Sequence, residues 1–550
     1  LAETSNDESR QVIKSHHDFA FHQVILLLGY LNRFSYNPAR VEEAFRVSEE
    51  YKALFLFEGI AREEAMQRAG MVDRLIQKTK ALGAAVAEAE DGLHGAEILG
   101  DSASVVSERS RLFTARQDYQ NHLVDIERKY PAYSAWKNRD YLPTVKAVQE
   151  KLLDEHTALV SILVTGVRTS AFVITQKDIR YHTCHTCEVY NSRKLRPVLD
   201  TLLHSLKPQL EVPDSVQFQR LIASATTLYD SLLRVPLSHL GDSIDRLIII
   251  PDDFLSQDVP FELLGDYSAW KNKPPVSFAE FPFLLKKYTV QYAPSCNLLL
   301  YQMEQKREKA PRLFAGFAPK YESSDTLAPL LASRSALVRD GLYDLPGARE
   351  EVQTIASMTH GNIFLDRSAS ETSFKSEAEN YRILHLAAHS LLDENNPNFS
   401  RLLLSHTPGD TSEDNNLNAV ELQNLHLRAD LAVLSACNTG TGLLKPGEGS
   451  MSLSRSFMQA GVPATIMSLW KVPDEATRQI MVEFYKNLKS GQRKDVALRN
   501  AKLAYLASTK DPLLASPWYW AGFVAAGDMR PVEMDEPVGL SGWLYWTLGL

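Results

Sequence analysis

Two short apolar segments each end in a side chain that can take part in nucleophilic chemistry. The first starts at Ile383 and ends in His389, and the second starts at Leu431 and reaches Cys437. A cysteine thiol is mostly protonated at neutral pH, so it needs an imidazole that takes its proton or pairs with the thiolate. The two segments therefore predict Cys437 as a nucleophile and His389 as its base.

Strands must position these two side chains. Both segments are apolar and strand-like, and two parallel strands ending side by side would bring His389 and Cys437 together at the carboxyl edge of one sheet. Cys437 follows His389 by 48 residues, close to the roughly 50 residues that separate the two in caspases. The order and spacing indicate a cysteine protease.

Small residues surround both positions, which leaves room for a substrate backbone. Ala387 and Ala388 precede the histidine, and Ser435 and Ala436 precede the cysteine. The turn 438–442 supplies amides that, with the Cys437 N–H, would stabilise an oxyanion. Taken alone, a cysteine or a histidine at a strand end is more often a buried structural residue.

The surrounding sequence resembles the CHAT family of caspase-like proteases, which are relatives of separase. Seven ordered segments carry the resemblance: 345–352, 384–389, 434–440, 447–449, 457–463, 468–477 and 516–523. Segments 260–264 and 292–295 extend it back to about residue 157. The resemblance implies an α/β caspase-like fold and a cysteine endopeptidase, a peptide-bond hydrolase, with His389 as base and Cys437 as nucleophile. It also implies a role in bacterial signalling or defence.

The same resemblance suggests further site residues. Many relatives have Gly after the histidine where this chain has Ser390, and the backbones of Ser390 and Cys437 are the candidates for an oxyanion site. Separase-like relatives use an Asp at the position of Asp474 to accept a basic side chain before the cut. Asp474 equally fits an acidic cap or first-turn residue of the helix that follows it. No cofactor is expected.

Composition limits the class of protein. With 550 residues, the chain is expected to hold about three domains, and its 44% hydrophobic content indicates a globular protein. A net charge of −9 argues against direct nucleic-acid binding, which needs a basic face. Four cysteines are too few for a disulfide framework, so we expect a reducing, cytoplasmic location.

We predict four parts along the chain. Residues 1–150 are helical: 41–56 resembles the last helix of a tetratricopeptide-repeat array, and 61–93 with 103–130 form a hairpin interrupted near Asp91 and at 100–102. Residues 157–305 form a pseudo-caspase α/β half, with strands at 159–164, 170–174 and 246–252 and helices over 195–233. Residues 310–530 form the active half. The apolar tail, 531–550, is either the start of a transmembrane helix that would anchor the protein from about 538, or a segment packed on the protease.

Two other signals need weighing. Cys184 and Cys187 have metal-ligand spacing, but no second pair follows, so an ordinary strand or turn is favoured and no metal site is predicted. A catalytically silent interaction scaffold is the alternative function, since the helical region and the pseudo-caspase half both suit contacts. We also expect a protein substrate and a regulatory protein partner bound through the helical region, because an always-open protease would be toxic.

Overall fold

The computed structural model of the chain describes the following residues: 23–25, 27–28, 37–52, 56, 60, 62, 65–66, 69–100, 102–133, 143–165, 168–183, 192–206, 215–252, 255, 259–271, 278–321, 345–393, 397–406, 413–435, 443–445 and 449–534. Cys437 and residues 438–442 lie outside these ranges, as do Cys184 and Cys187.

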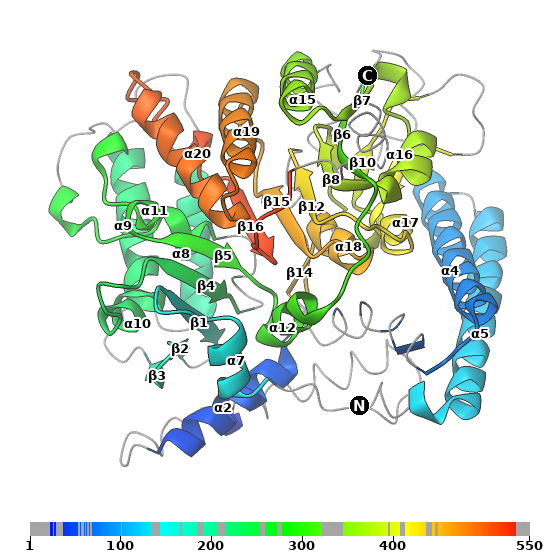
Figure 1. Cartoon of the computed structure of the whole chain (residues 1–550), viewed down its shortest axis with the longest axis horizontal. Helices are drawn as coiled ribbons and strands as arrows, with labels where there is room; N and C mark the ends of the chain where they lie inside the picture. The colour runs from blue at the N-terminus through cyan, green and yellow to red at the C-terminus, as the bar shows by residue number, and fades with distance from the viewer. Residues whose placement is uncertain are drawn as a thin grey trace, which may run out of the picture.

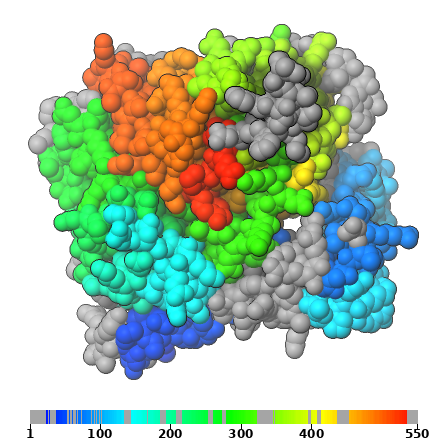
Figure 2. Space-filling view, in the orientation of Figure 1, coloured from blue at the N-terminus to red at the C-terminus, as the bar shows by residue number. Residues whose placement is uncertain are grey.

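The N-terminal region is helical where it is described. Its helices are α2 (Pro38–Tyr51), α4 (Asp73–Leu99), α5 (Ser102–Lys129) and α7 (Val145–Lys151). Helices α4 and α5 form the predicted antiparallel hairpin, because Thr79 contacts His122 at 3.0 Å while Glu97 contacts Arg109 at 3.3 Å. In the space-filling view this hairpin forms one side of the molecule (Figure 2).

The predicted interruption of the hairpin near Asp91 is wrong. Helix α4 continues through Asp91 and Gly92 to Leu99 and is capped by Gly100, whose φ of 69° is left-handed. Glycine adopts this conformation without the steric cost that a Cβ would add, and it commonly ends helices. Interior glycines such as Gly92 lower helix stability but did not break a helix that packs on its neighbour along its length.

Eleven of the described strands form one mixed sheet, in the order β3-β2-β1-β4-β5-β16-β15-β12-β8-β6-β7 (Figure 1). The strands are β1 (Thr157–Val164), β2 (Thr169–Ile174), β3 (Ile179–Thr183), β4 (Arg246–Ile250), β5 (Thr289–Tyr292), β6 (Arg312–Ala318), β7 (Asn362–Leu365), β8 (Tyr381–Leu386), β12 (Leu431–Leu434), β15 (Ala464–Ser468) and β16 (Phe523–Gly527). The predicted neighbouring strands pair as β1 and β2, and the predicted buried strand is β4.

Helices cover both faces of this sheet. They are α8 (Ser192–Leu206), α9 (Ser215–Leu232), α10 (Arg234–Ser238), α11 (Leu284–Lys287), α12 (Cys296–Glu304), α15 (Pro346–Thr359), α16 (Glu371–Glu377), α17 (Ala419–Gln423), α18 (Leu453–Gln459), α19 (Asp474–Lys489) and α20 (Lys494–Ser508). Side chains alternate across a strand. In β6, Phe314 packs on Tyr485 of α19, whereas Phe317 packs on Phe374 of α16. Helices α16 and α19 therefore lie on opposite faces.

The two predicted α/β halves share this sheet. Strand β5 of the first half pairs in parallel with β16, with Tyr292 opposite Ala526. One cluster of buried apolar residues runs through both halves, from Ala158 to Val532. The predicted domain boundaries therefore divide the sequence, whereas the hydrophobic core is continuous across them.

A buried polar network attaches helix α2 to the first half. Lys52, just after α2, donates to Ser161 of β1 at 2.8 Å, and Ser161 donates to Glu49 at 3.0 Å. Glu49 also accepts the backbone N–H of Cys296 at 2.7 Å. Buried charges are stable only when they are paired and hydrogen-bonded, so this network fixes where α2 docks.

Across the described ranges, no helix is both long enough and apolar enough to cross a membrane. The predicted apolar tail, 531–550, is described only as far as residue 534. The predicted membrane anchor therefore lies outside the described residues.

Candidate active site

Strands β8 and β12 are neighbours and run parallel, as predicted. Their register pairs Leu386 with Leu434, the last residue of each strand. His389 is the third residue after Leu386, and Cys437 is the third after Leu434. Both sequence positions thus follow their strands by the same number of residues, and these strands end together at the carboxyl edge of the sheet, where open α/β sheets build their sites.

Tyr321 fixes the backbone at His389. Its hydroxyl accepts the His389 backbone N–H at 2.8 Å and donates to the Leu403 carbonyl oxygen at 2.9 Å. The two rings also pack together, with centroids 4.7 Å apart. The histidine is buried, with 3% of its surface exposed. Tyr321 was not predicted, because no motif around it links it to His389, 68 positions later in the chain.

A small sheet holds the segment that follows the histidine. Its strands are β9 (Ser390–Leu391), β10 (Arg401–Leu403) and β11 (Asn416–Asn418). The Leu403 N–H donates to the His389 carbonyl oxygen at 2.9 Å, and Ser390 lies opposite Leu402. Ser390 is buried beside the histidine. Its part in an oxyanion site stays a prediction.

A small pocket opens at the carboxyl ends of β8, β12 and β15. Its volume is about 30 Å³. It is lined by Leu345, Gly347, Ala348, Glu351, Ala387, Ala388, Ser435, Ser468, Trp470, Lys471, Val472, Asp474, Thr477 and Phe523. The small residues predicted to flank the dyad, Ala387, Ala388 and Ser435, therefore form part of one pocket.

Glycines shape the walls of this pocket. A Cβ on Gly522 would lie 2.8 Å from Val472 and 3.0 Å from Trp470, and one on Gly347 would lie 2.9 Å from the Asp474 Cβ. Such contacts are closer than packed carbon atoms allow. Trp470 is held in place, because its Nε1–H donates to the Trp518 carbonyl oxygen at 2.8 Å.

Asp474 lies in this pocket and also begins helix α19. It is the first residue of the helix, and the N-cap position before it is taken by Pro473. Of the predicted helix roles, the first-turn role is confirmed and the cap role is wrong. The positive end of the helix dipole stabilises its carboxylate. The exposed side chain also lines the pocket.

A buried network lies beside the pocket. The Glu351 carboxylate lies 2.8 Å from His385 Nε2, and the Tyr485 hydroxyl lies 3.1 Å from His385 Nδ1. Burial raises the pKa of Tyr485 well above its ordinary value. The Tyr485 hydroxyl therefore stays protonated, and the geometry fits Nε2–H donating to Glu351 while Nδ1 accepts from Tyr485. Both Glu351 and His385 fall in segments that carry the family resemblance, but no role was predicted for either residue.

Three carboxylates form a cluster away from this site. Ligand atoms of Glu371, Glu413 and Glu421 all lie within 4.8 Å of one another. The Lys375 ammonium reaches the three at 2.8, 2.7 and 2.9 Å. Burial, and then the charge of Glu421, raise the pKa of Glu371 to about 8. Because the Lys375 ammonium already contacts all three carboxylates, it stands where a metal ion would bind, and the cluster does not favour one.

The segment around Cys184 is described in part. His182 belongs to strand β3 and stacks on His239, with ring centroids 4.7 Å apart. The predicted strand or turn is thus a strand up to Thr183, and the cysteines themselves lie outside the described residues.

Comparison with known families decides the identity of this fold. The CHAT domain family matches residues 223–528, more than half of the chain. The chain belongs to the CHAT domain family. The predicted fold class, an α/β caspase-like fold preceded by helices, is confirmed. The match begins within α9, so it includes most of the first half as well as the second.

Two curated proteins and several solved structures resemble this CHAT protein. Tetratricopeptide repeat protein 28 of Mus musculus and its Homo sapiens counterpart are each 24% identical over 294 residues. The alignments cover 47% of this chain but only 12% and 11% of those proteins. This chain therefore spans a small part of its curated relatives.

Among solved structures, similarity to the Saccharomyces cerevisiae separase in its complex with securin has a TM-score of 0.44 and 9% identity. It covers 77% of this chain and 34% of that chain. Similarity to the complex of Porphyromonas gingivalis RgpB pro- and mature domains has a TM-score of 0.34 and 10% identity, covering 62% and 78%.

Proposed function

We propose that this CHAT protein is a cysteine endopeptidase with Cys437 as nucleophile and His389 as base. The observation that carries the proposal is the register of β8 and β12, whose last residues, Leu386 and Leu434, pair at one edge of the sheet and each precede a proposed dyad member by three residues. Support also comes from the family match and from a pocket lined by Ala388, next to His389, and by Ser435, two residues before Cys437.

The proposed reaction follows from the two groups. The His389 imidazole takes the thiol proton of Cys437, and the thiolate attacks the carbonyl carbon of the substrate peptide bond. Backbone N–H groups at Cys437 and Ser390 would stabilise the resulting oxyanion. The histidine then protonates the leaving amine, and water hydrolyses the thioester to release the acid and restore the thiol.

We propose that Asp474 selects a basic residue before the cut. Its carboxylate lines the pocket beside Ala388 and Ser435, each next to or close to a proposed catalytic residue. Glu351 adds a second carboxylate to the same lining. An Arg or Lys side chain entering the pocket would form a charge-assisted hydrogen bond, whereas an acidic side chain would be repelled.

We infer that the described conformation is a resting state. A single water molecule needs roughly 10–15 Å³ of cavity volume, so a pocket of about 30 Å³ is too small for an arginine side chain. His389 is also buried, so a substrate has little access to its imidazole. A partner bound through the helical region, a ligand or cleavage would widen the pocket, as expected for a cytosolic protease with a role in signalling or defence.

The alternative function is a catalytically silent scaffold, which the burial of His389 also favours. A search for new protein N-termini after adding the purified protein to a cell lysate, with Cys437→Ala as control, distinguishes the two. The endopeptidase predicts new N-termini that depend on Cys437. A purified chain that cleaves at full rate with no partner, ligand or self-processing would contradict the resting state but not the activity.

A further inference from the structure

A second cavity, much larger than the first, lies between the helical hairpin and the CHAT domain. Its volume is about 640 Å³. Helices α4 and α5 form one wall, the segment after α12 forms another, and the segments after α17 and α18 form the rest. Cavities of roughly 300–1,000 Å³ are the size that holds small organic ligands.

The lining of this cavity is strongly cationic, although the chain as a whole has a net charge of −9. Five basic side chains line it, and Glu308 is the one acidic residue among its described lining. The basic residues are Arg62, Lys80, Lys306, Arg307 and Arg428. Such a concentration of positive charge favours an anionic ligand.

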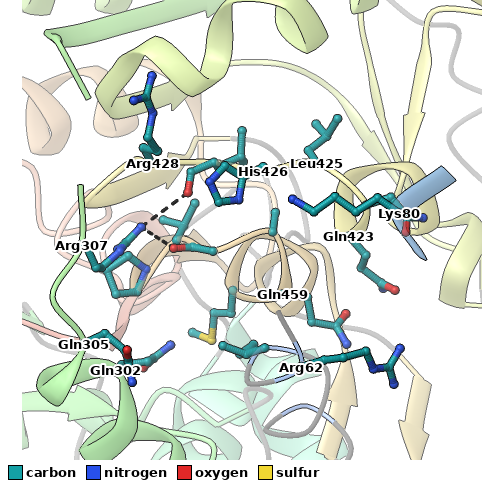
Figure 3. A pocket seen from close by; sticks show the side chains of 18 of the residues that line it. Arg62, Lys80, Gln302, Gln305, Arg307, Gln423, Leu425, His426, Arg428 and Gln459 are labelled. Carbon is teal, nitrogen blue, oxygen red and sulfur yellow. Dashed lines mark hydrogen bonds between the residues drawn. The ribbon is translucent and has the colours of Figure 1, made fainter. Parts of the chain in front are cut away.

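The side chains approach the cavity from different elements. In Figure 3, Lys80 reaches from α4 towards His426, while Arg307 lies on the opposite wall. Dashed lines mark hydrogen bonds from the Arg307 guanidinium to main-chain oxygens of the lining, which are those of Leu427, at 3.5 Å, and Gly461. Arg307 also donates to the Ala429 main-chain oxygen at 3.1 Å, outside the lining. Arg428 extends away from the centre in the same view.

Several buried polar atoms of the lining residues have no hydrogen-bond partner in the protein. Within the described part of the chain, Nη1 of Arg307 and the side-chain oxygens of Gln302 and Gln459 have no hydrogen-bond partner. All three residues line the cavity. Buried polar groups normally have partners. Each of these three atoms is itself buried, so a ligand that offers acceptors and donors would pair with them once the side chains turn towards the cavity.

The lining also has an apolar part. Met66, Ile76, Leu425 and Met458 lie among the polar groups. A ligand body with an apolar or aromatic surface would pack against these side chains while its charged end meets the cations.

We propose that this cavity binds an organic phosphate of nucleotide size. Phosphate oxygens would accept from Lys80 and Arg307, and the N–H and O–H groups of a base and sugar would pair with the glutamine amides. The segments that follow α17 and α18 lead directly into the amino ends of β12 and β15. The ligand would thus bind at the opposite ends of the two strands that lead to the pocket and to Cys437.

Isothermal titration calorimetry on the full chain tests this proposal, with ATP, AMP, inorganic pyrophosphate and a hexaglutamate peptide as probes. We expect saturable binding of a nucleotide and weaker binding of the other two probes. Lys80→Gln should weaken nucleotide binding about tenfold or more, because it removes one charge-assisted hydrogen bond. Lys78→Gln is the matched control, since Lys78 is exposed on the same helix and does not line the cavity.

Lys306→Gln is a second variant on an exposed residue outside the hairpin, and it should weaken binding in the same direction. Circular dichroism checks that each variant folds. The proposal is overturned if neither nucleotide binds at millimolar concentration, or if a folded Lys80→Gln or Lys306→Gln protein binds as tightly as the native chain. Pyrophosphate or hexaglutamate binding as tightly as the nucleotides would also overturn it, in favour of a simple anion or an acidic peptide.

Discussion

Leu386 and Leu434 lie opposite each other at the ends of two parallel strands, and each is followed at its third position by one member of the proposed dyad. The spacing of 48 residues between His389 and Cys437 equals the spacing between the paired leucines. Because parallel neighbours keep one register, the two strands end at the same level of the sheet edge, and the proposed dyad members follow those ends by equal numbers of residues. The relationship ties the chemistry proposed from the sequence to the geometry of the fold.

Asp474→Asn should lower turnover of peptides with Arg or Lys before the cut by roughly tenfold or more, because the pocket loses its charge pair with the substrate. Alkylation of Cys437 should be unchanged, since neither nucleophile nor base is touched. The matched control is Glu475→Gln in the same helical turn: Glu475 pairs with Arg478 at 2.7 Å and does not line the pocket. Equal activity of Asp474→Asn on basic peptides would leave Asp474 as a first-turn residue only.

Tyr321→Phe should lower kcat several-fold with little change in KM, because the hydroxyl that holds the His389 backbone is lost. The free energy of unfolding should fall by roughly 1–2 kcal/mol. Tyr267→Phe is the control. It also removes a buried hydroxyl, which donates to the main-chain oxygen of Leu263, but its position is far from the candidate active site in the sequence. If both variants reduce stability and neither changes kcat, Tyr321 has a structural role only.

Cys437 should react with iodoacetamide faster than Cys296. Cys296 is buried, and burial together with Glu49 raises the pKa of its thiol well above the ordinary value. A thiolate held by His389 would instead be reactive at neutral pH. Mass spectrometry of the alkylated peptides over time measures both rates. His389→Ala should slow the reaction at Cys437 alone, and similar rates at the two cysteines would argue for the silent scaffold.

The folded chain should lose stability as pH falls from about 6.5 to 4. Burial, and then the charge of His239, lower the pKa of His182 to about 4. In this window the unfolded chain binds a proton that the folded chain does not, so unfolding becomes more favourable. His182→Gln should reduce this loss by roughly 1–3 kcal/mol. Urea unfolding at several pH values checks it, with His204→Gln on the exposed face of α8 as control; identical pH profiles for the native chain and His182→Gln would contradict it.

The sequence predicted the elements that carry the site, because their patterns are local. The apolar runs ending near His389 and Cys437 are typical of buried strands, and they form β8 and β12 in parallel. The contact between Tyr321 and His389 could not be predicted, since it depends on how β10 folds back on the sheet. The sequence alone did not decide whether Asp474 belongs to the specificity pocket or to the start of a helix. In the structure it begins the helix and also lines the pocket.

The same distinction applies outside the site. The hairpin of α4 and α5 was predicted from apolar spacing, but its length was not, because packing between the helices outweighs the low helix propensity of Gly92. The buried pair of Glu49 and Lys52 gave no sequence signal, since its partners come from β1 and α12. Long-range polar contacts of this kind follow from tertiary structure alone.

The most direct test of the account compares the native chain with Cys437→Ala and His389→Ala on a substrate protein identified by its new N-terminus. Cleavage is followed by gel and mass spectrometry, and thermal unfolding checks that each variant is folded. Because nucleophile and base act as one unit, each substitution alone should abolish cleavage. Cleavage that persists in a folded Cys437→Ala protein would contradict the assignment of this CHAT protein as a cysteine endopeptidase.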